Sequence, residues 1–220
     1  MIKAVIFDMD GLLIDSEPLW KQAELDIFPG LGVPLTYEMT SETTGLRVDE
    51  VVEHWRSRFP WDSPSSQDVD DRIVERLIEL VNESGLPMAG AEHLIALISK
   101  TGLPMAIASS SKNVIIQAVL SKLGIEDRMK VVHSAQHETH GKPHPGVYIT
   151  TASKLGVAPA DCLAFEDSIN GVLAAKAAKM KCVAVPDPGV RDDKRFGIAD
   201  MVIDSLDDFT PDMFKLLDKL

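Results

Sequence analysis

The chain is poor in cysteine and in basic residues. Its 220 residues include two cysteines, Cys162 and Cys182, which lack the spacing of a metal-binding pair. This argues against a disulfide-stapled fold or a cysteine-ligated zinc site, and we expect both thiols to be reduced and buried in a cytoplasmic protein. Only 22 lysines and arginines stand against 34 acidic residues, so the formal net charge is −12. That excess of negative charge argues against nucleic acid or an anionic membrane as the main partner.

Three other patterns are missing. No apolar run is long enough to span a membrane, and the chain does not open on a basic segment followed by a long apolar stretch, so we expect neither a membrane span nor an export signal. No Gly-x-Gly-x-x-Gly follows the first apolar run, which disfavours a dinucleotide site. With 45% hydrophobic and 25% charged residues, the composition is that of a globular protein able to bury a full core.

Short apolar runs alternate with helical patterns over much of the chain. Apolar residues recur at helical spacing within residues 114–123, 147–155 and 172–178. Strands that alternate with helices predict an α/β fold, a doubly wound parallel sheet covered on both faces. The predicted strands are residues 2–7, 104–108, 129–132, 162–165, 182–185 and 201–203.

One segment, residues 16–84, interrupts this alternation with helical stripes and turn residues. We expect its first helix to begin at Ser16-Glu17-Pro18, with Ser16 as the cap and Pro18 in the first turn. The sequence therefore predicts two domains, an α/β core of residues 1–15 and 85–220 and an inserted helical cap of residues 16–84.

Two carboxylates follow the first predicted strand. Asp8 and Asp10 are two residues apart, so in an extended chain they point to the same side, and Gly11 then permits a turn. Crowded carboxylates repel and need a cation or a shared proton, which favours a metal-dependent site. An ordinary turn would use the same residues. A calcium loop is disfavoured because its first ligand position would fall on Ile6.

Polar residues also follow three later strands, and parallel sheets bind ligands beyond the carboxyl ends of their strands. These residues are Ser109-Ser110-Ser111, Lys142, and Glu166-Asp167-Ser168. Taken singly, the serines and acidic residues could cap the helices that follow, and Lys142 could be a solvated loop residue. Together with Asp8 and Asp10, at four successive strand ends, they predict a phosphate and metal site.

These motifs resemble those of haloacid dehalogenase (HAD) superfamily phosphatases that carry a helical cap after the first strand. The resemblance extends along the whole chain. Its subgroup features are similar to bacterial sugar-phosphate phosphatases of the 2-deoxyglucose-6-phosphate and hexitol phosphatase type. The matching stretches are Phe7–Trp20, Thr44–Arg47, Ser109, Lys142-Pro143 and Glu166-Asp167-Ser168-x-x-Gly171.

The resemblance implies a role for each motif residue. Asp8 would be the nucleophile that forms an aspartyl-phosphate, and Asp10 the general acid and then base. Ser109 and Lys142 would bind the phosphate, with backbone N–H groups near Gly11 and Ser110 as further donors. The substrate would be a small phosphorylated sugar or sugar alcohol.

A metal ion and a cap residue complete the implied site. Mg²⁺ would be held by Asp8, Asp167, Glu166 and the backbone carbonyl of Asp10. Arg47, after Gly45, would either contact the leaving group or lie on the surface of the following helix.

Two other functions stay open. A phosphomutase resembling β-phosphoglucomutase would use the same motifs, whereas a non-catalytic sugar-phosphate sensor or scaffold would have no use for both Asp8 and Asp10. We expect a monomer. Lys179 stands where the family commonly ends a helix with Gly. Either a left-handed Lys there costs about 1 kcal/mol, or the helix ends differently.

Overall fold

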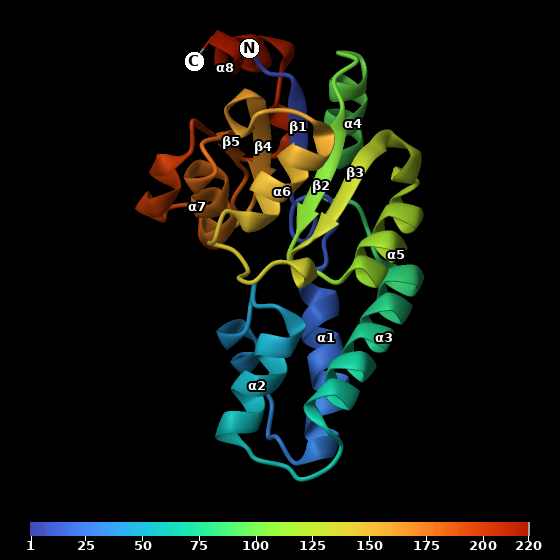
Figure 1. The fold of residues 1–220 in the computed structure, drawn as a ribbon. Coiled ribbons are helices and arrows are strands. Elements are labelled where there is room, and N and C mark those ends of the chain that lie inside the picture. Colours follow the sequence, from blue (N-terminus) through green and yellow to red (C-terminus); the bar gives the residue numbers. More distant parts are fainter. Residues whose placement is uncertain (220) are drawn as a thin grey trace.

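The computed structural model describes residues 1–219, so that Leu220, the last residue of the predicted core range, lies outside the described residues. Six parallel strands form one sheet in the order β3-β2-β1-β4-β5-β6 (Figure 1). The order reverses at β1, with β2 and β3 on one side and β4, β5 and β6 on the other, as in a doubly wound fold. The predicted fold class is confirmed. The strands are β1 (Ala4–Phe7), β2 (Met105–Ser109), β3 (Met129–Ser134), β4 (Cys162–Glu166), β5 (Lys181–Ala184) and β6 (Met201–Val202).

Helices cover both faces of this sheet, which is why β1 reads Ala-Val-Ile-Phe and buries all four side chains. Val5 and Phe7 share an apolar cluster with α4 (Ala91–Ser99), α5 (Asn113–Leu123) and α8 (Pro211–Lys219). Ala4 and Ile6 belong to a second cluster, rich in alanine, with α6 (Gly146–Leu155) and α7 (Ile169–Ala177). We call the sheet and these five helices the sheet body.

The remaining helices lie together beyond the carboxyl end of the sheet (Figure 1). They are α1 (Glu17–Ile27), α2 (Val48–Arg58) and α3 (Ser66–Ser84), here called the cap bundle. The longest, α3, is capped by Ser65, whose hydroxyl accepts from the Asp68 N–H at 3.2 Å, and it packs against α1, α2 and α5. Apolar side chains of the cap bundle join the cluster that contains Phe7. The domain boundaries at residues 16 and 84 stay a prediction.

Two antiparallel linkers join the cap bundle to the sheet body. Asp15 N–H donates to the carbonyl of Leu86 at 3.0 Å, and Met88 N–H donates to that of Leu13 at 3.0 Å. Ile14 and Pro87 form the bridge between them. The chain therefore leaves for the cap bundle and returns from it at one place.

Two of the predicted serine caps hold their positions, and one does not. Ser168 caps α7, because its hydroxyl accepts from the Gly171 N–H at 3.0 Å. Ser16 is the N-cap residue of α1 and Pro18 lies in the first turn, as predicted, but the Ser16 hydroxyl donates to Asp10 Oδ1 at 2.7 Å and makes no cap hydrogen bond. At α5 the N-cap residue is Lys112 rather than one of the preceding serines.

Both cysteines are free and buried, as predicted. Burial raises the pKa of the Cys162 thiol to about 11, so it stays protonated and acts as a packing residue. Among the described residues, no helix combines the length and the apolar character needed to cross a membrane.

Lys179 has a φ of +66°, so of the two possible endings of α7 the left-handed one is present. Lys179 N–H donates to the carbonyl of Lys176 at 2.9 Å, and Met180 N–H donates to that of Ala175 at 3.0 Å. This is the Schellman pattern, in which Gly is normally preferred because a Cβ strains the left-handed conformation.

Replacing Lys179 by Gly is expected to increase the free energy of unfolding by about 1 kcal/mol, because the strained side chain is removed. Denaturant unfolding measures the change. Lys176→Gly, in the last turn of the same helix, is the control and is expected to lower stability by about 1 kcal/mol. Destabilisation by both substitutions would show that Lys179 carries no strain.

Candidate active site

Strand pairing brings the first and fourth motifs together. β1 and β4 are neighbours, Phe7 pairs with Phe165, and the Asp8 N–H donates to the Phe165 carbonyl at 3.0 Å. Asp8 and Glu166 therefore lie side by side at the point where the strand order reverses. In doubly wound sheets this is the position of the ligand crevice.

Lys142 reaches this point from the loop before α6. Its ammonium donates to Asp8 Oδ1 and to Glu166 Oε1, each at 2.6 Å. The Tyr148 hydroxyl, from α6, donates to the same Glu166 oxygen at 2.5 Å. The side chains of Lys142, Asp8 and Glu166 are 6%, 8% and 0% exposed, so one ammonium is shared by two buried carboxylates.

Burial is the largest cause of the raised pKa values of Asp8 and Asp167. It raises the pKa of Asp8 to about 8, with Lys142 opposing the rise and Glu166 adding to it. The pKa of Asp167 is also raised well above its usual range, first by burial and then by the charges of Asp8 and Glu166. Burial alone would lower the pKa of Lys142, but the two carboxylates raise it above its ordinary value. Asp8, Glu166 and Asp167 are here called the acidic group. The single ammonium of Lys142 does not balance the charge of these three carboxylates.

The donor set fits a hard divalent cation. Asp8, Glu166 and Asp167 each offer a carboxylate oxygen, and these oxygens lie within 4.8 Å of one another. Oxygen donors and excess negative charge are what Mg²⁺ requires. Gly11, with φ +75°, makes room, because a Cβ there would lie 2.4 Å from Asp167 Oδ2. Asp10, predicted to contribute its backbone carbonyl, has its carboxylate outside this group.

The carboxylate of Asp10 accepts hydrogen bonds from both parts of the molecule. Oδ2 accepts from Ser111 at 2.7 Å and from Ser109 at 3.3 Å, both at the end of β2. Oδ1 accepts from the hydroxyl of Ser16 at 2.7 Å and from Nε1 of Trp20 at 3.2 Å, at the start of the cap bundle. Asp10 is therefore held between the sheet body and the cap bundle.

The remaining predicted contacts lie around this centre. Ser110 is half-buried between Ser109 and Ser111. Arg47 precedes α2, and its Cδ would lie 3.5 Å from a Cβ placed on Gly141, so it passes next to the loop that carries Lys142. The predicted site residues thus converge on the carboxyl ends of β1, β2 and β4.

Four contacts were not predicted from the sequence. The sequence marks Ser111 only as part of a serine run, Ser16 as a helix cap, and Trp20 as the end of a stretch that resembles the family. Tyr148 carried no signal, because an aromatic residue on a helix usually packs against its neighbours. Trp55 and Trp61, by contrast, are buried in the cap bundle.

The chain belongs to the haloacid dehalogenase-like hydrolases, a family that it matches over residues 2–179. The resemblance seen in the motifs is confirmed, and the protein is a hydrolase. Hexitol phosphatase B from Escherichia coli (strain K12) is 44% identical to it over 210 residues, 95% of each chain.

Solved structures agree with this assignment. CbbY from Rhodobacter sphaeroides, solved in complex with phosphate, has a TM-score of 0.85 at 28% identity, over 94% of this chain and 96% of its own. β-Phosphoglucomutase from Clostridium difficile has a TM-score of 0.86 at 22% identity, over 100% of this chain and 98% of its own. This second likeness shows the fold.

Gly171→Ala is expected to destabilise the protein by about 1–3 kcal/mol, because the new Cβ would force the buried Glu166 side chain from its partners. A Cβ at Gly171 would lie 1.9 Å from Glu166 Cδ. Without that clash, Ala in a helix would be favoured over Gly by about 1 kcal/mol, so the sign itself is diagnostic. Denaturant unfolding gives the change.

The control is Gly197→Ala, where a Cβ would meet no atom within 4 Å among the described residues. It is expected to change the free energy of unfolding by less than about 0.5 kcal/mol. Equal effects at both positions would contradict a specific contact with Glu166.

Proposed function

We propose that the protein is a Mg²⁺-dependent phosphatase that hydrolyses hexose and hexitol monophosphates through an aspartyl-phosphate. The observation that carries the proposal is the buried Asp8 carboxylate, held by Lys142 beside an acidic group, with a second carboxylate two residues away. A carboxylate that only binds a phosphate dianion would weaken that binding by charge repulsion. Its place here is explained by nucleophilic attack.

Asp8 acts in the first step. Lys142 donates to Oδ1, so we assign Oδ2 as the attacking oxygen. A bond forms between this oxygen and phosphorus while the bond from phosphorus to the sugar oxygen breaks. Lys142 then offsets charge that develops on the phosphoryl oxygens, and Ser109 donates to one of them.

Asp10 moves the protons. It gives a proton to the departing sugar oxygen. In the second step it takes a proton from the water that attacks phosphorus, while the bond from phosphorus to Asp8 Oδ2 breaks and inorganic phosphate leaves. The hydroxyls of Ser16 and Ser111 and the indole N–H of Trp20 fix the orientation of its carboxylate. The proton acceptor is therefore already positioned when the sugar leaves.

The acidic group would hold the metal. Asp8, Asp167 and Glu166 are the residues that we assign to Mg²⁺, with the backbone carbonyl of Asp10. When bound, the cation offsets repulsion between the Asp8 carboxylate and the phosphate dianion.

The substrate class rests on the cap bundle and on one relative. Hexitol phosphatase B is 44% identical over nearly the whole chain. Arg47, at the border of the cap bundle, is our candidate for a contact with the leaving group. We propose that the enzyme acts as a monomer.

A phosphomutase is the second candidate, because β-phosphoglucomutase shares the fold. The two reactions diverge only after the aspartyl-phosphate has formed, when either water or a second sugar hydroxyl attacks it. Product analysis separates them, since a mutase would convert β-glucose 1-phosphate into the 6-phosphate. A non-catalytic sensor would give neither product.

Asp8→Asn and Asp10→Asn are expected to differ in their dependence on the leaving group. With sorbitol 6-phosphate, each should lose at least about a hundredfold in kcat, because nucleophile and acid are both needed. With p-nitrophenyl phosphate, whose leaving group needs no proton, Asp10→Asn should recover much of the first step and Asp8→Asn none. Phosphate and nitrophenolate release are the measurements.

Asp15→Asn, on the exposed linker residue five positions after Asp10, serves as the control and should retain activity. Circular dichroism establishes that all three variants are folded. Normal turnover by folded Asp8→Asn would rule out the aspartyl-phosphate route.

Asp167→Asn is expected to raise the Mg²⁺ concentration for half-maximal phosphate release by at least about tenfold, because one oxygen ligand loses its charge. Asp161→Asn, which removes a surface ion pair with Lys3, should leave that concentration unchanged. Wild-type activity that persists in chelator would contradict the metal assignment.

A further inference from the structure

The border between the cap bundle and the sheet body carries a partly buried ion pair. Lys112 comes directly after Ser111, whose hydroxyl contacts Asp10, and its ammonium pairs with the carboxylate of Asp70 on α3. The Asp70 side chain is 5% exposed and that of Lys112 is 27% exposed. Asp71 adds a second carboxylate at 3.8 Å from the same ammonium.

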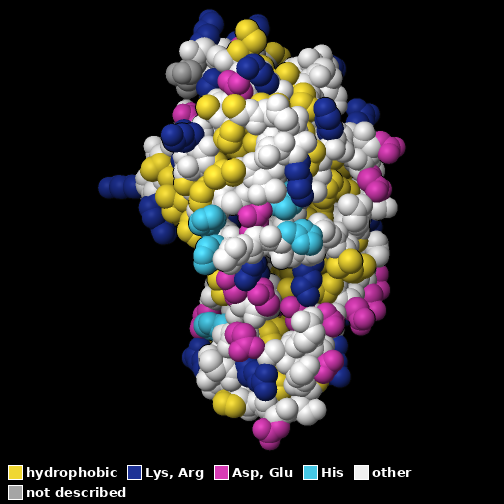
Figure 2. Space-filling model, viewed as in Figure 1, with side chains coloured by type: hydrophobic (Ala, Val, Ile, Leu, Met, Phe, Trp, Pro, Cys, Tyr) yellow, Lys and Arg dark blue, Asp and Glu magenta, His cyan; other side chains and the backbone are white. Residues whose placement is uncertain are grey.

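The other cation assigned to this border is paired as well. Arg47 lies 3.1 Å from Asp49 Oδ2 and 3.8 Å from Glu50 Oε1, measured from its guanidinium nitrogens. Figure 2 shows acidic and basic side chains gathered where the cap bundle meets the sheet body. Lys112 and Arg47 thus both form ion pairs with carboxylates of the cap bundle.

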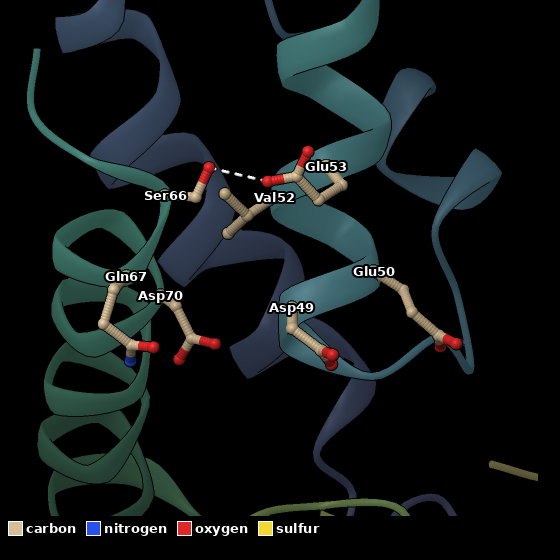
Figure 3. A pocket seen from close by; sticks show the side chains of 7 residues that line it. All are labelled: Asp49, Glu50, Val52, Glu53, Ser66, Gln67 and Asp70. Atoms are coloured by element: carbon tan, nitrogen blue, oxygen red, sulfur yellow. Dashed lines mark hydrogen bonds between the residues drawn. The ribbon is translucent and has the colours of Figure 1, made fainter. Parts of the chain in front are cut away.

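The pocket next to Asp70, between α2 and α3, is lined by further acidic residues. An open pocket of about 210 Å³ lies between α2 and α3, and Figure 3 shows Asp49 and Glu53 on α2 opposite Asp70 on α3. Burial raises the pKa of Asp70, Lys112 lowers it, and the charges of Asp71 and Asp49 raise it further, so two more carboxylates act on the pair. The residues that line the pocket are Asp49, Glu50, Val52, Glu53, Ser66, Gln67 and Asp70.

We propose that Asp70 is a specificity-determining residue that neutralises Lys112, so that the site takes monophosphates with an uncharged, polyhydroxylated leaving group and rejects those with a second anionic group. This inference rests on the proposed phosphatase function. A second anion would have to displace a buried carboxylate from Lys112 and then lie among like charges. Hydroxyl groups, in contrast, donate hydrogen bonds to carboxylates.

A pair of matched substrates tests the role of Asp70. Sorbitol 6-phosphate and 6-phosphogluconate differ only at the carbon farthest from the phosphate, which carries a hydroxyl in one and a carboxylate in the other. The wild-type enzyme is expected to favour sorbitol 6-phosphate in kcat/KM, and Asp70→Asn to reduce that preference by at least about tenfold. The reduction should come from improved use of 6-phosphogluconate, because Lys112 becomes available to its carboxylate.

Two further variants separate charge pairing from structure. Asp70→Asn combined with Lys112→Met should restore the preference, since no ammonium remains to receive the carboxylate. Glu75→Gln removes an exposed charge from the same helix and should leave the preference unchanged. If Asp70→Asn lowers kcat/KM for both substrates equally, Asp70 only fastens the cap bundle to the sheet body, and the inference is overturned.

Binding of the same two compounds, measured by calorimetry, keeps this test independent of turnover. A shift of the affinity ratio toward 6-phosphogluconate in Asp70→Asn supports the inference even where no phosphate is released, and a shift the other way overturns it. An unchanged affinity ratio overturns it. Absence of phosphate release from sorbitol 6-phosphate by the wild-type enzyme would instead count against the proposed function.

Discussion

One ammonium shared by two buried carboxylates holds the centre of this molecule together. Asp8 and Glu166 end neighbouring strands, and each accepts a hydrogen bond of 2.6 Å from Lys142. Without that cation, two carboxylates would face each other away from water, which costs several kcal/mol. Three other features keep Glu166 in place. Lys142 and the Tyr148 hydroxyl donate hydrogen bonds to its carboxylate, and Gly171 leaves room for its side chain.

The sequence predicted this centre well because its residues are placed by backbone geometry. Apolar runs show where strands end, and parallel strands bring their carboxyl ends to one edge. Asp8, Ser109 and Glu166 could be found in that way. Lys142 was included because it lies past the third predicted strand, but a loop residue is placed by the path of its loop, and the resemblance then gave it a role.

Contacts that depend on the packing of side chains could not be predicted in the same way. Trp20 reaches Asp10 only because α1 lies beyond the carboxyl end of the sheet, and nothing in its helical spacing tells this orientation from a core orientation. The pairing of Lys112 with Asp70 joins residues 42 positions apart on two parts of the molecule. The local pattern predicts Ser16 as a helix cap. Its hydroxyl donates to the tertiary partner Asp10 and does not accept a hydrogen bond from the first turn of the helix.

The two antiparallel linkers have an evolutionary consequence. The chain leaves the sheet body near Leu13 and returns near Met88, and hydrogen bonds join the two linkers. The contacts within the sheet body therefore do not depend on the segment inserted between these linkers. An insert whose ends are adjacent can be lengthened, shortened or exchanged at little cost to the fold that accepts it. Phosphate chemistry and choice of leaving group can therefore diverge at separate rates. The first is constrained by the sheet, whereas the second can vary with the inserted helices.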